Sequence, residues 1–342
     1  MSTCIPETSY FATHEFLSIV CHCISCIDIP INMFGAWIIL YRTPPNMSSV
    51  KWPMLNLHFW SSFLDVSISS LTIPYVLFPA IAGYPLGVLK EFGVSTAAQI
   101  HGVVTMVSLV LVSILTVFEN RYFVVASNSK RQRNASKCLL VFLYVTCFVF
   151  MVPFTIMIPE QGEAVRLVFQ ELPCLPAYVY KSPVFVYTNH IWPVFITIAT
   201  LLVTIANLVF TIITLTIRTF LRRTKDLTLS RKTESMQKKF LFAVIIQTTI
   251  PIVIIVFPIL YLAVSLPQGY YNQSVNNFLF ISFSIHGLLS TISMLALQKQ
   301  YREATLTVLF LCSSRSVTDE NTGISQRRKT VVQPENLILQ SR

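Results

Sequence analysis

The sequence predicts an all-α membrane protein, a bundle of seven transmembrane helices with its amino terminus outside and its carboxyl terminus inside the cell. Three observations predict this fold. Of the 342 residues, 54% are hydrophobic and 12% are charged, whereas soluble globular proteins carry about 25% charged residues. Seven apolar stretches are each long enough to cross a bilayer, which takes about 20 residues. Lysine and arginine collect in alternate connections between these stretches.

The seven stretches form a bundle over residues 16–297. We expect helices because a spanning backbone must satisfy its own hydrogen bonds, and because barrel strands are shorter, about ten residues each. Asp28 and Asp65 are the formal charges that fall inside the stretches. In chain order, the predicted spans are residues 16–41, 54–84, 96–118, 138–159, 190–217, 240–266 and 277–297.

Orientation follows from the basic residues, which are retained on the cytoplasmic side of short loops. The first, third and fifth connections and the region after the last span hold 22 of the 25 Lys and Arg residues. We therefore expect residues 1–15 to be extracellular. The net charge of +10 then faces the anionic inner leaflet of the lipid bilayer and acidic cytosolic partners, and binding to nucleic acid is not expected.

After the last span, residues 298–312 predict a juxtamembrane amphipathic helix along the inner surface, and a plain continuation of the seventh helix is the alternative. Its spacing places four residues on one face, Tyr301, Thr305, Val308 and Cys312. Cys312 is a candidate for palmitoylation there. Residues 313–342 are polar and aperiodic, which predicts a disordered cytoplasmic tail.

Two charged residues mark the inner end of the third span, Glu119 and Arg121 in TVFENRYF. G-protein-coupled receptors carry an acid and an arginine at this position, where the arginine helps to keep the inner face closed. The alternative is that both side chains merely reach into the polar headgroups, where charges cost little. Because Asn120 separates them, Glu119 and Arg121 do not share a helix face. We expect Arg121 to face inward and Glu119 to face headgroups or a neighbouring helix.

Motifs along most of the chain, from about residue 16 to 310, resemble the nematode serpentine chemoreceptors of class H. They are Thr43-Pro44, Lys51-Trp52, Leu55-Asn56-Leu57-His58-Phe59-Trp60, Ala82-Gly83-Tyr84, Leu86-Gly87, Phe118-Glu119-Asn120-Arg121, Gln237-Lys238-Lys239-Phe240, Gln247, Ile250-Pro251, His286-Gly287 and Ser290-Thr291. The resemblance implies a G-protein-coupled receptor for environmental small molecules such as odorants, displayed on the plasma membrane of sensory cilia. It implies a heterotrimeric G protein as partner. Candidate coupling residues are Glu119, Arg121, Arg222, Arg223, Lys238 and Lys239.

Asp28 and Asp65 lie deep within the predicted spans, where a charge is expensive. At 1.5 Å per residue, Asp65 is about 20 Å from Trp52 and Asp28 about 18 Å from Phe16, so both lie near mid-depth. His286 in the seventh span could join them. We expect either a polar cluster of these three residues or separate partners for each, such as Ser61, Ser69 or Asn32.

The outer halves of spans three, five, six and seven contain no carboxylate, so they do not predict a site for an amine. Their polar and aromatic residues favour a neutral or weakly polar ligand, and an interfacial aromatic belt is the alternative interpretation. The candidate pocket residues are Gln99, His101, Asn189, His190, Trp192 and Tyr261.

Two further features concern covalent and conformational chemistry. Cys174 lies in the long outer connection of residues 160–189, and Cys4 is the preferred disulfide partner, with Cys21 and Cys23 as the other outward candidates.

Pro251 and Pro258 in the sixth span predict a hinge, because each proline removes a backbone hydrogen bond.

Two other classes of function fit the sequence less well. A transporter or channel could use Asp28 and Asp65 as ion ligands, but the sequence lacks the internal repeat that such proteins commonly show. An enzyme would need a convergent catalytic set, and the sequence holds no catalytic motif of a known class and no metal or cofactor motif. We therefore expect neither enzymatic activity nor a cofactor.

Overall fold

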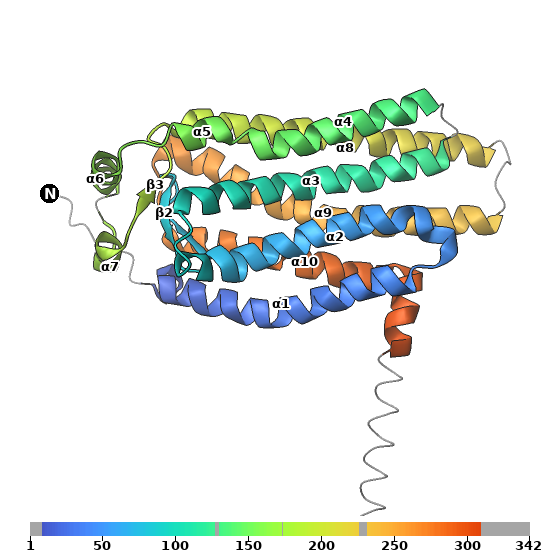
Figure 1. Ribbon diagram of the computed structural model, residues 1–342, viewed down its shortest axis with the longest axis horizontal. Helices are drawn as coiled ribbons and strands as arrows, with labels where there is room; N and C mark the ends of the chain where they lie inside the picture. The colour runs from blue at the N-terminus through green and yellow to red at the C-terminus, as the bar shows by residue number, and fades with distance from the viewer. Residues whose placement is uncertain (1–8, 127–129, 173, 226–230, 309–342) are drawn as a thin grey trace, which may run out of the picture.

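The computed structural model describes residues 9–126, 130–172, 174–225 and 231–308. Within these residues, seven long helices run side by side along the long axis of the molecule (Figure 1). They are α1 (His14–Arg42), α2 (Ser48–Val66), α3 (Thr96–Val125), α4 (Lys130–Val149), α8 (Ile191–Lys225), α9 (Arg231–Gln268) and α10 (Gln273–Leu297). Six of these are long and apolar enough to cross a membrane when α4 is counted together with α5 (Val152–Ile156). The remaining one, α2, is shorter and carries buried polar residues such as His58 and Asp65.

The second predicted span, residues 54–84, differs most from the structure. The α-helix ends at Val66, a π-helical turn covers Ser67–Thr72, and Ile73 adopts a left-handed conformation with φ 39°. The chain then forms an antiparallel hairpin of β1 (Pro74–Val76) and β2 (Ala82–Pro85). Prolines cannot donate backbone hydrogen bonds, which explains why the helix does not continue. The apolar residues of this segment cover the end of the bundle.

A small sheet closes that end of the bundle. β3 (Phe185–Val186) pairs with β2, which gives the strand order β1-β2-β3. Beside the sheet lie α6 (Gln161–Glu171) and α7 (Ala177–Lys181), and together these elements form the sheet end of the molecule (Figure 1). The Glu160 carboxylate caps α6 by accepting from the N–H groups of Glu163 and Gly162, and these bonds lower the pKa of Glu160.

The opposite end, which we call the basic end, holds the last turns of α3 and α8, the first turns of α4 and α9, and a short helix over residues 299–308 (Figure 1). Here α3 runs seven residues past Phe118, the predicted end of the third span, so Glu119 and Arg121 are helical. The helix of the predicted fourth span starts earlier than expected, at Lys130, and the span is divided between α4 and α5 by a break after Val149. In the helix over 299–308, Tyr301 is buried and Arg302 exposed, as an amphipathic helix requires.

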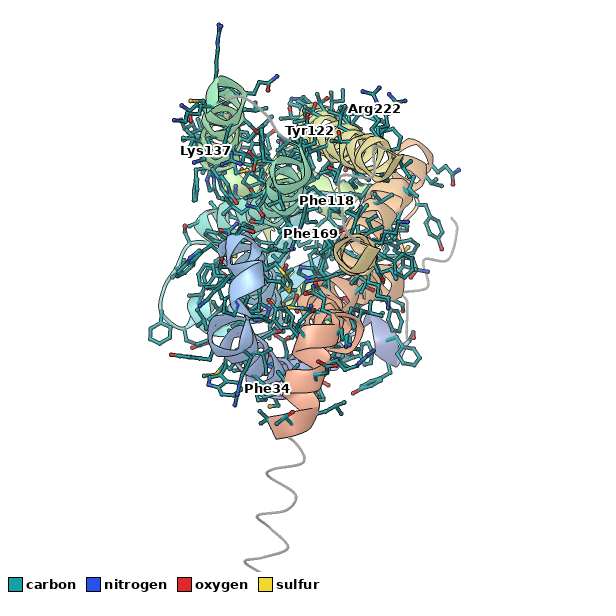
Figure 2. The ribbon with its side chains drawn as sticks, turned by 90° about the vertical axis from the view of Figure 1, so that its right-hand side faces the viewer. Phe34, Phe118, Tyr122, Lys137, Phe169 and Arg222 are labelled. Atoms are coloured by element: carbon teal, nitrogen blue, oxygen red, sulfur yellow. The ribbon has the colours of Figure 1, made fainter. Side chains whose placement is uncertain are left out.

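The main hydrophobic core lies around α3, which is the most enclosed helix. Its residues from Leu109 to Phe118 are nearly all buried against α2, α4, α8 and α9. Figure 2, seen from the basic end, shows Phe118 in the interior and Arg222 at the periphery. Side chains facing away from the core, such as Phe210 and Phe242, are exposed and apolar, which suits contact with lipid tails. Cys4, Cys312 and the predicted tail of residues 313–342 lie outside the described residues.

Candidate functional site

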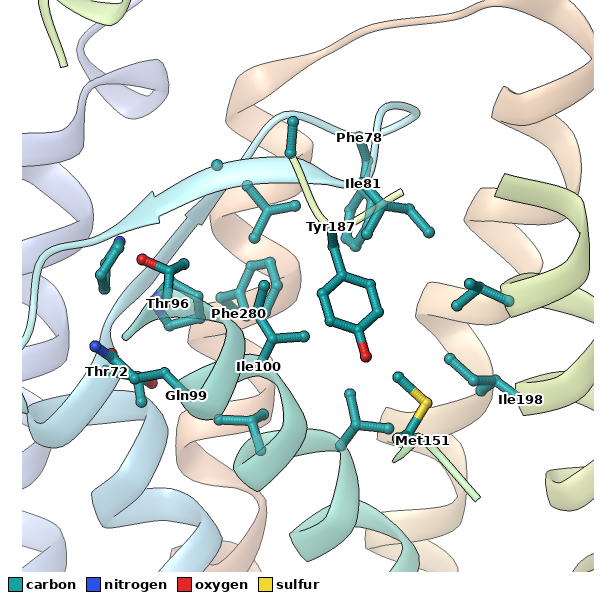
Figure 3. Close-up of a pocket in the computed structure, with 18 of the residues that line it drawn as sticks. Thr72, Phe78, Ile81, Thr96, Gln99, Ile100, Met151, Tyr187, Ile198 and Phe280 are labelled. Atoms are coloured by element: carbon teal, nitrogen blue, oxygen red, sulfur yellow. The ribbon is translucent and has the colours of Figure 1, made fainter. Parts of the chain in front are cut away.

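A cavity of about 220 Å³ lies between the sheet end and the adjoining halves of α3, α8, α9 and α10. The hairpin covers it, α3 and α8 form its sides, and Tyr187 reaches into it from the segment after β3 (Figure 3). Almost all of its wall is apolar. The lining residues are Thr72, Pro74, Val76, Phe78, Ile81, Ala82, Gly83, Tyr84, Pro85, Thr96, Gln99, Ile100, Val103, Val104, Met151, Tyr187, Val194, Phe195, Ile198, Ala199, Leu262 and Phe280.

Of the six pocket residues expected from the sequence, Gln99 lines this cavity and the other five do not. His101 turns towards α5, where its Nδ1 lies 3.2 Å from the Thr155 hydroxyl. Asn189, His190 and Trp192 are exposed at the start of α8. Tyr261 lies in α9 and is also absent from the cavity lining. For a helical residue such as His101, sequence position determines the depth, whereas the rotation of the helix determines which way the side chain faces.

Sequence reasoning missed the hairpin as the main cover of the pocket. The signal was the 31-residue length of the predicted second span together with its internal prolines at 74 and 79, since about 20 residues suffice to span. The start of α10 holds the hairpin in place. Gln273 Nε2 donates to the Val76 carbonyl at 3.2 Å, and Asn276 Nδ2 donates to the Phe78 carbonyl at 3.1 Å. Both side chains are at most 1% exposed.

The structure brings the three intramembrane ionisable residues together, from three different helices. His286 Nδ1 of α10 lies 2.5 Å from Asp65 Oδ1 of α2, and both side chains are buried. Asp65 Oδ2 accepts the backbone N–H of Leu288 at 2.8 Å. Asp28 of α1 faces Asp65 and accepts from Asn32 Nδ2 at 2.5 Å. The two alternatives from the sequence therefore both occur: the three ionisable residues form one cluster, and Asp28 also has Asn32 as a partner of its own.

Two polar residues extend this cluster towards the basic end. Thr291 Oγ1 donates to Asn32 Oδ1 at 2.7 Å, and His58 Nε2 lies 2.8 Å from the Asn32 carbonyl. The helices approach closely at Gly287, where an added Cβ would lie 2.7 Å from Asp65 Oδ2 and 2.9 Å from the Ser61 carbonyl. The absence of a side chain at Gly287 is therefore what allows the carboxylate to reach the backbone of α10.

At the basic end, Glu119 and Arg121 face different neighbours. Glu119 faces α4, beside Ser136, Lys137 and Arg133. Arg121 is half-buried and interacts with Tyr301 of the helix over 299–308. Burial raises the pKa of Tyr301, and its contact with Thr43 and the charge of Arg121 act in the opposite direction. This arrangement matches the expectation that the two charged residues point in different directions.

Tyr301 and Gln298 hold elements of the basic end together. The sequence placed Tyr301 on one face of the short helix without a partner, and it assigned Gln298 no role. The Tyr301 hydroxyl lies 3.0 Å from Thr43 Oγ1, which joins the short helix to the end of α1. Gln298 Nε2 donates to Gln247 Oε1 at 3.2 Å, which joins the end of α10 to α9. Gln247 is one of the motif residues named from the sequence. A glutamine within an apolar span needs a hydrogen-bond partner, and this was the sequence signal that could have predicted the contact.

The other predicted coupling residues lie at the same end, whereas the predicted hinge residues lie further along α9. Arg222, Lys238 and Lys239 are exposed, and Arg223 lies in the last turn of α8. Pro251 and Pro258 both lie inside the continuous helix α9.

Cys174 forms a disulfide. Cys21 and Cys23, two of its three predicted partners, are free. Cys4, the preferred partner, lies outside the described residues, so the Cys4–Cys174 pairing stays a prediction.

Comparison with known proteins identifies the family. The chain is similar to the Caenorhabditis elegans protein named Serpentine receptor class H-72, with 26% identity over 320 residues, which are 92% of this chain and 91% of that protein. The family described as serpentine type 7TM GPCR chemoreceptor Srh matches residues 12–311. It is a receptor family and not an enzyme family, and its members are multi-pass membrane proteins, in agreement with the apolar helices. The resemblance read from the sequence motifs is therefore confirmed, and the chain belongs to the Srh family of serpentine seven-transmembrane chemoreceptors.

Proposed function

We propose that this chain is a chemosensory receptor of the plasma membrane that binds a small molecule at the sheet end and activates a heterotrimeric G protein at the basic end. The apolar cavity beneath the hairpin carries this proposal, because it is a concave apolar site, with room for a small molecule, at the end opposite the basic surface. In a sensory neuron the sheet end would face the environment, with the cilium as the expected location.

The proposal includes seven spans, with α2 as the one that composition alone does not identify. Ser48–Val66 is about 28 Å long at 1.5 Å per residue, close to the thickness of the hydrocarbon core. Its polar residues Asp65 and His58 are covered by α1 and α10 and so avoid the lipid. An ion pathway through Asp28 and Asp65 gains no support from this packing, because protein groups already occupy the cluster.

Signal transfer would begin where the bundle is held closed at the basic end. The Gln247–Gln298 contact holds α9 to the end of α10, and the Tyr301–Thr43 contact holds the short helix to α1 beside Arg121. A ligand that binds the open bundle more tightly than the closed one would shift the population towards the open form. Outward movement of α9 would then expose Arg121 to the G protein. The basic side chains Arg222, Lys238 and Lys239 would attract an acidic partner and mainly raise its association rate.

The decisive test is Arg121→Ala in full-length receptor, read as nucleotide exchange on an added G protein. We expect exchange to be abolished while surface display and ligand binding stay near wild type. Arg121→Lys keeps the charge but loses the planar fork of donors, so it should recover only part of the activity. The double variant Lys238→Ala/Lys239→Ala is the matched control for charge and should only slow the exchange. Wild-type exchange by Arg121→Ala at equal display would contradict this mechanism.

A further inference from the structure

The walls of the cavity offer a ligand almost no polar surface, although several of the lining residues are polar. The Tyr187 hydroxyl is engaged with Thr155 Oγ1 at 3.0 Å, outside the cavity lining. The Thr72 hydroxyl donates to the Ser67 carbonyl at 2.7 Å, and Gln99 Nε2 donates to the Val94 carbonyl at 2.9 Å. These bonds turn the Tyr187 and Thr72 hydroxyls and the Gln99 amide nitrogen into the protein. Gln99 Oε1 accepts no hydrogen bond from the described residues but is itself buried, so the accessible wall of the cavity is almost entirely carbon.

The wall is also without charge. No Asp, Glu, Lys, Arg or His occurs among the described residues that line it. Burial raises the pKa of Tyr187 and raises that of Tyr84 to about 12, so both phenols are neutral at physiological pH. An ionic ligand would have to lose its hydration without gaining a counter-charge, which is strongly unfavourable.

The size of the cavity sets an upper limit on the ligand. An apolar cavity of about 150 Å³ in another protein stays dry and binds benzene. By proportion, about 220 Å³ holds roughly nine carbon atoms. Figure 3 shows how the space is bounded, with Phe78 and Ile81 of the hairpin segment above it and Met151 and Ile198 across from Ile100.

We propose that this receptor selects uncharged, hydrocarbon-like molecules of about nine carbons, recognised by shape and apolar contact without a hydrogen bond. The inference rests on the proposed receptor function and narrows its ligand class. A hydroxyl group added to such a ligand would lose its water partners and find none in the wall, so it weakens binding.

The test uses three probes that share one carbon skeleton: propylbenzene, 3-phenylpropan-1-ol and 3-phenylpropanoate. The full-length chain in lipid nanodiscs is unfolded by heat with each probe, because a ligand that binds the folded state raises the midpoint. Ala199→Leu fills the cavity from α8. Val203→Leu is the control one turn away, where it adds a single methylene to a side chain that is 59% exposed on the outer face. Propylbenzene dissolves equally in the lipid around both variants, so their difference isolates the cavity.

We expect propylbenzene to raise the midpoint of the wild type and of Val203→Leu but not of Ala199→Leu. The alcohol should bind at least about tenfold more weakly and the carboxylate should have no effect. Stronger binding of the alcohol, lost in Gln99→Leu, would overturn the inference and make the Gln99 amide the recognition group. Equal shifts in Ala199→Leu and Val203→Leu would overturn it as well, since the probe would then act through the lipid.

Signalling assays in cells separate this inference from the receptor function. Activation by charged compounds alone would overturn the ligand class while the receptor function stands. Stabilisation by propylbenzene that depends on Ala199, without activation of any supplied G protein, would support the ligand class and count against the proposed coupling.

Discussion

At the scale of single residues, a small set of buried polar atoms determines how α1, α2 and α10 fit together. Asp65 receives His286 on one oxygen and the Leu288 N–H on the other, so its two oxygens fix α10 in both rotation and height. Buried charges are tolerated inside a membrane when they are paired in this way. These contacts offset the cost of burying Asp65 and make it a specific contact between α2 and α10.

Gly287→Ala tests this close fit, because the added methyl group would collide with the Asp65 carboxylate and the Ser61 carbonyl. We expect a loss of about 1–3 kcal/mol in stability, the usual cost of overpacking. Thermal unfolding of the purified chain in detergent measures it. Gly102→Ala in α3 is the matched control, since its added Cβ would meet nothing nearer than 3.9 Å. That change should be neutral or stabilise by about 0.5–1 kcal/mol. Equal effects of both changes would count against the proposed fit.

At the scale of elements, α9 combines a weakened backbone with a tether. Pro251 cannot donate to the carbonyl of Gln247, four residues earlier. The side chain of that same Gln247 accepts from Gln298. The helix is therefore easiest to bend at the turn where it is also held, and this favours Pro251 as the hinge over Pro258, about two turns further along α9.

Pro251→Ala should restore the missing backbone bond and stiffen α9. We expect ligand-stimulated nucleotide exchange to fall several-fold while surface display is unchanged. Gln298→Leu is the opposing variant, because it removes the tether at nearly constant volume and should raise exchange without ligand. Equal loss of display and exchange in Pro251→Ala would instead indicate that the proline serves static packing.

At the scale of the whole molecule, the two ends differ in chemistry along the bundle axis. Apolar cover and the sheet lie at one end, and the exposed basic residues Arg222, Lys238 and Lys239 lie at the other. The negative charge of the inner leaflet would attract the basic end, so this difference between the ends would orient the bundle with the basic end in the cytoplasm.

Labelling of single introduced cysteines checks both orientation and span number. Lys181→Cys at the sheet end and Arg222→Cys at the basic end are both at exposed positions. A membrane-impermeant thiol reagent on intact cells should label Lys181→Cys, and Arg222→Cys only after permeabilisation, with the unmodified chain as background. Tags on the two termini should appear on opposite sides, as an odd number of spans requires. Labelling of Arg222→Cys in intact cells would reverse the proposed orientation.

The sequence by itself determined the membrane class and the family, and it located the long helices except for the outer half of the second predicted span. These properties follow from local composition, because any stretch of about 20 apolar residues without charges must avoid water. Asp28, Asp65 and His286 were candidates from the sequence, because a polar group in hydrocarbon needs a partner, but whether they would share a cluster or find separate partners stayed open at that stage.

The tertiary structure alone decided which side chains meet. A helix can rotate about its own axis without any change in hydropathy, so depth predicted His101 and Trp192 as pocket residues while rotation faced them elsewhere. The apolar composition of residues 74–85 suits either a span through lipid or a cover over a cavity, so composition could not distinguish the two. The structure forms a hairpin there, which pairs with β3 about a hundred residues away and covers the cavity. Hydrophobic burial does not depend on direction, whereas the hydrogen bonds from Gln273, Asn276 and Tyr301 do, and these contacts between distant segments positioned the pocket and the basic end.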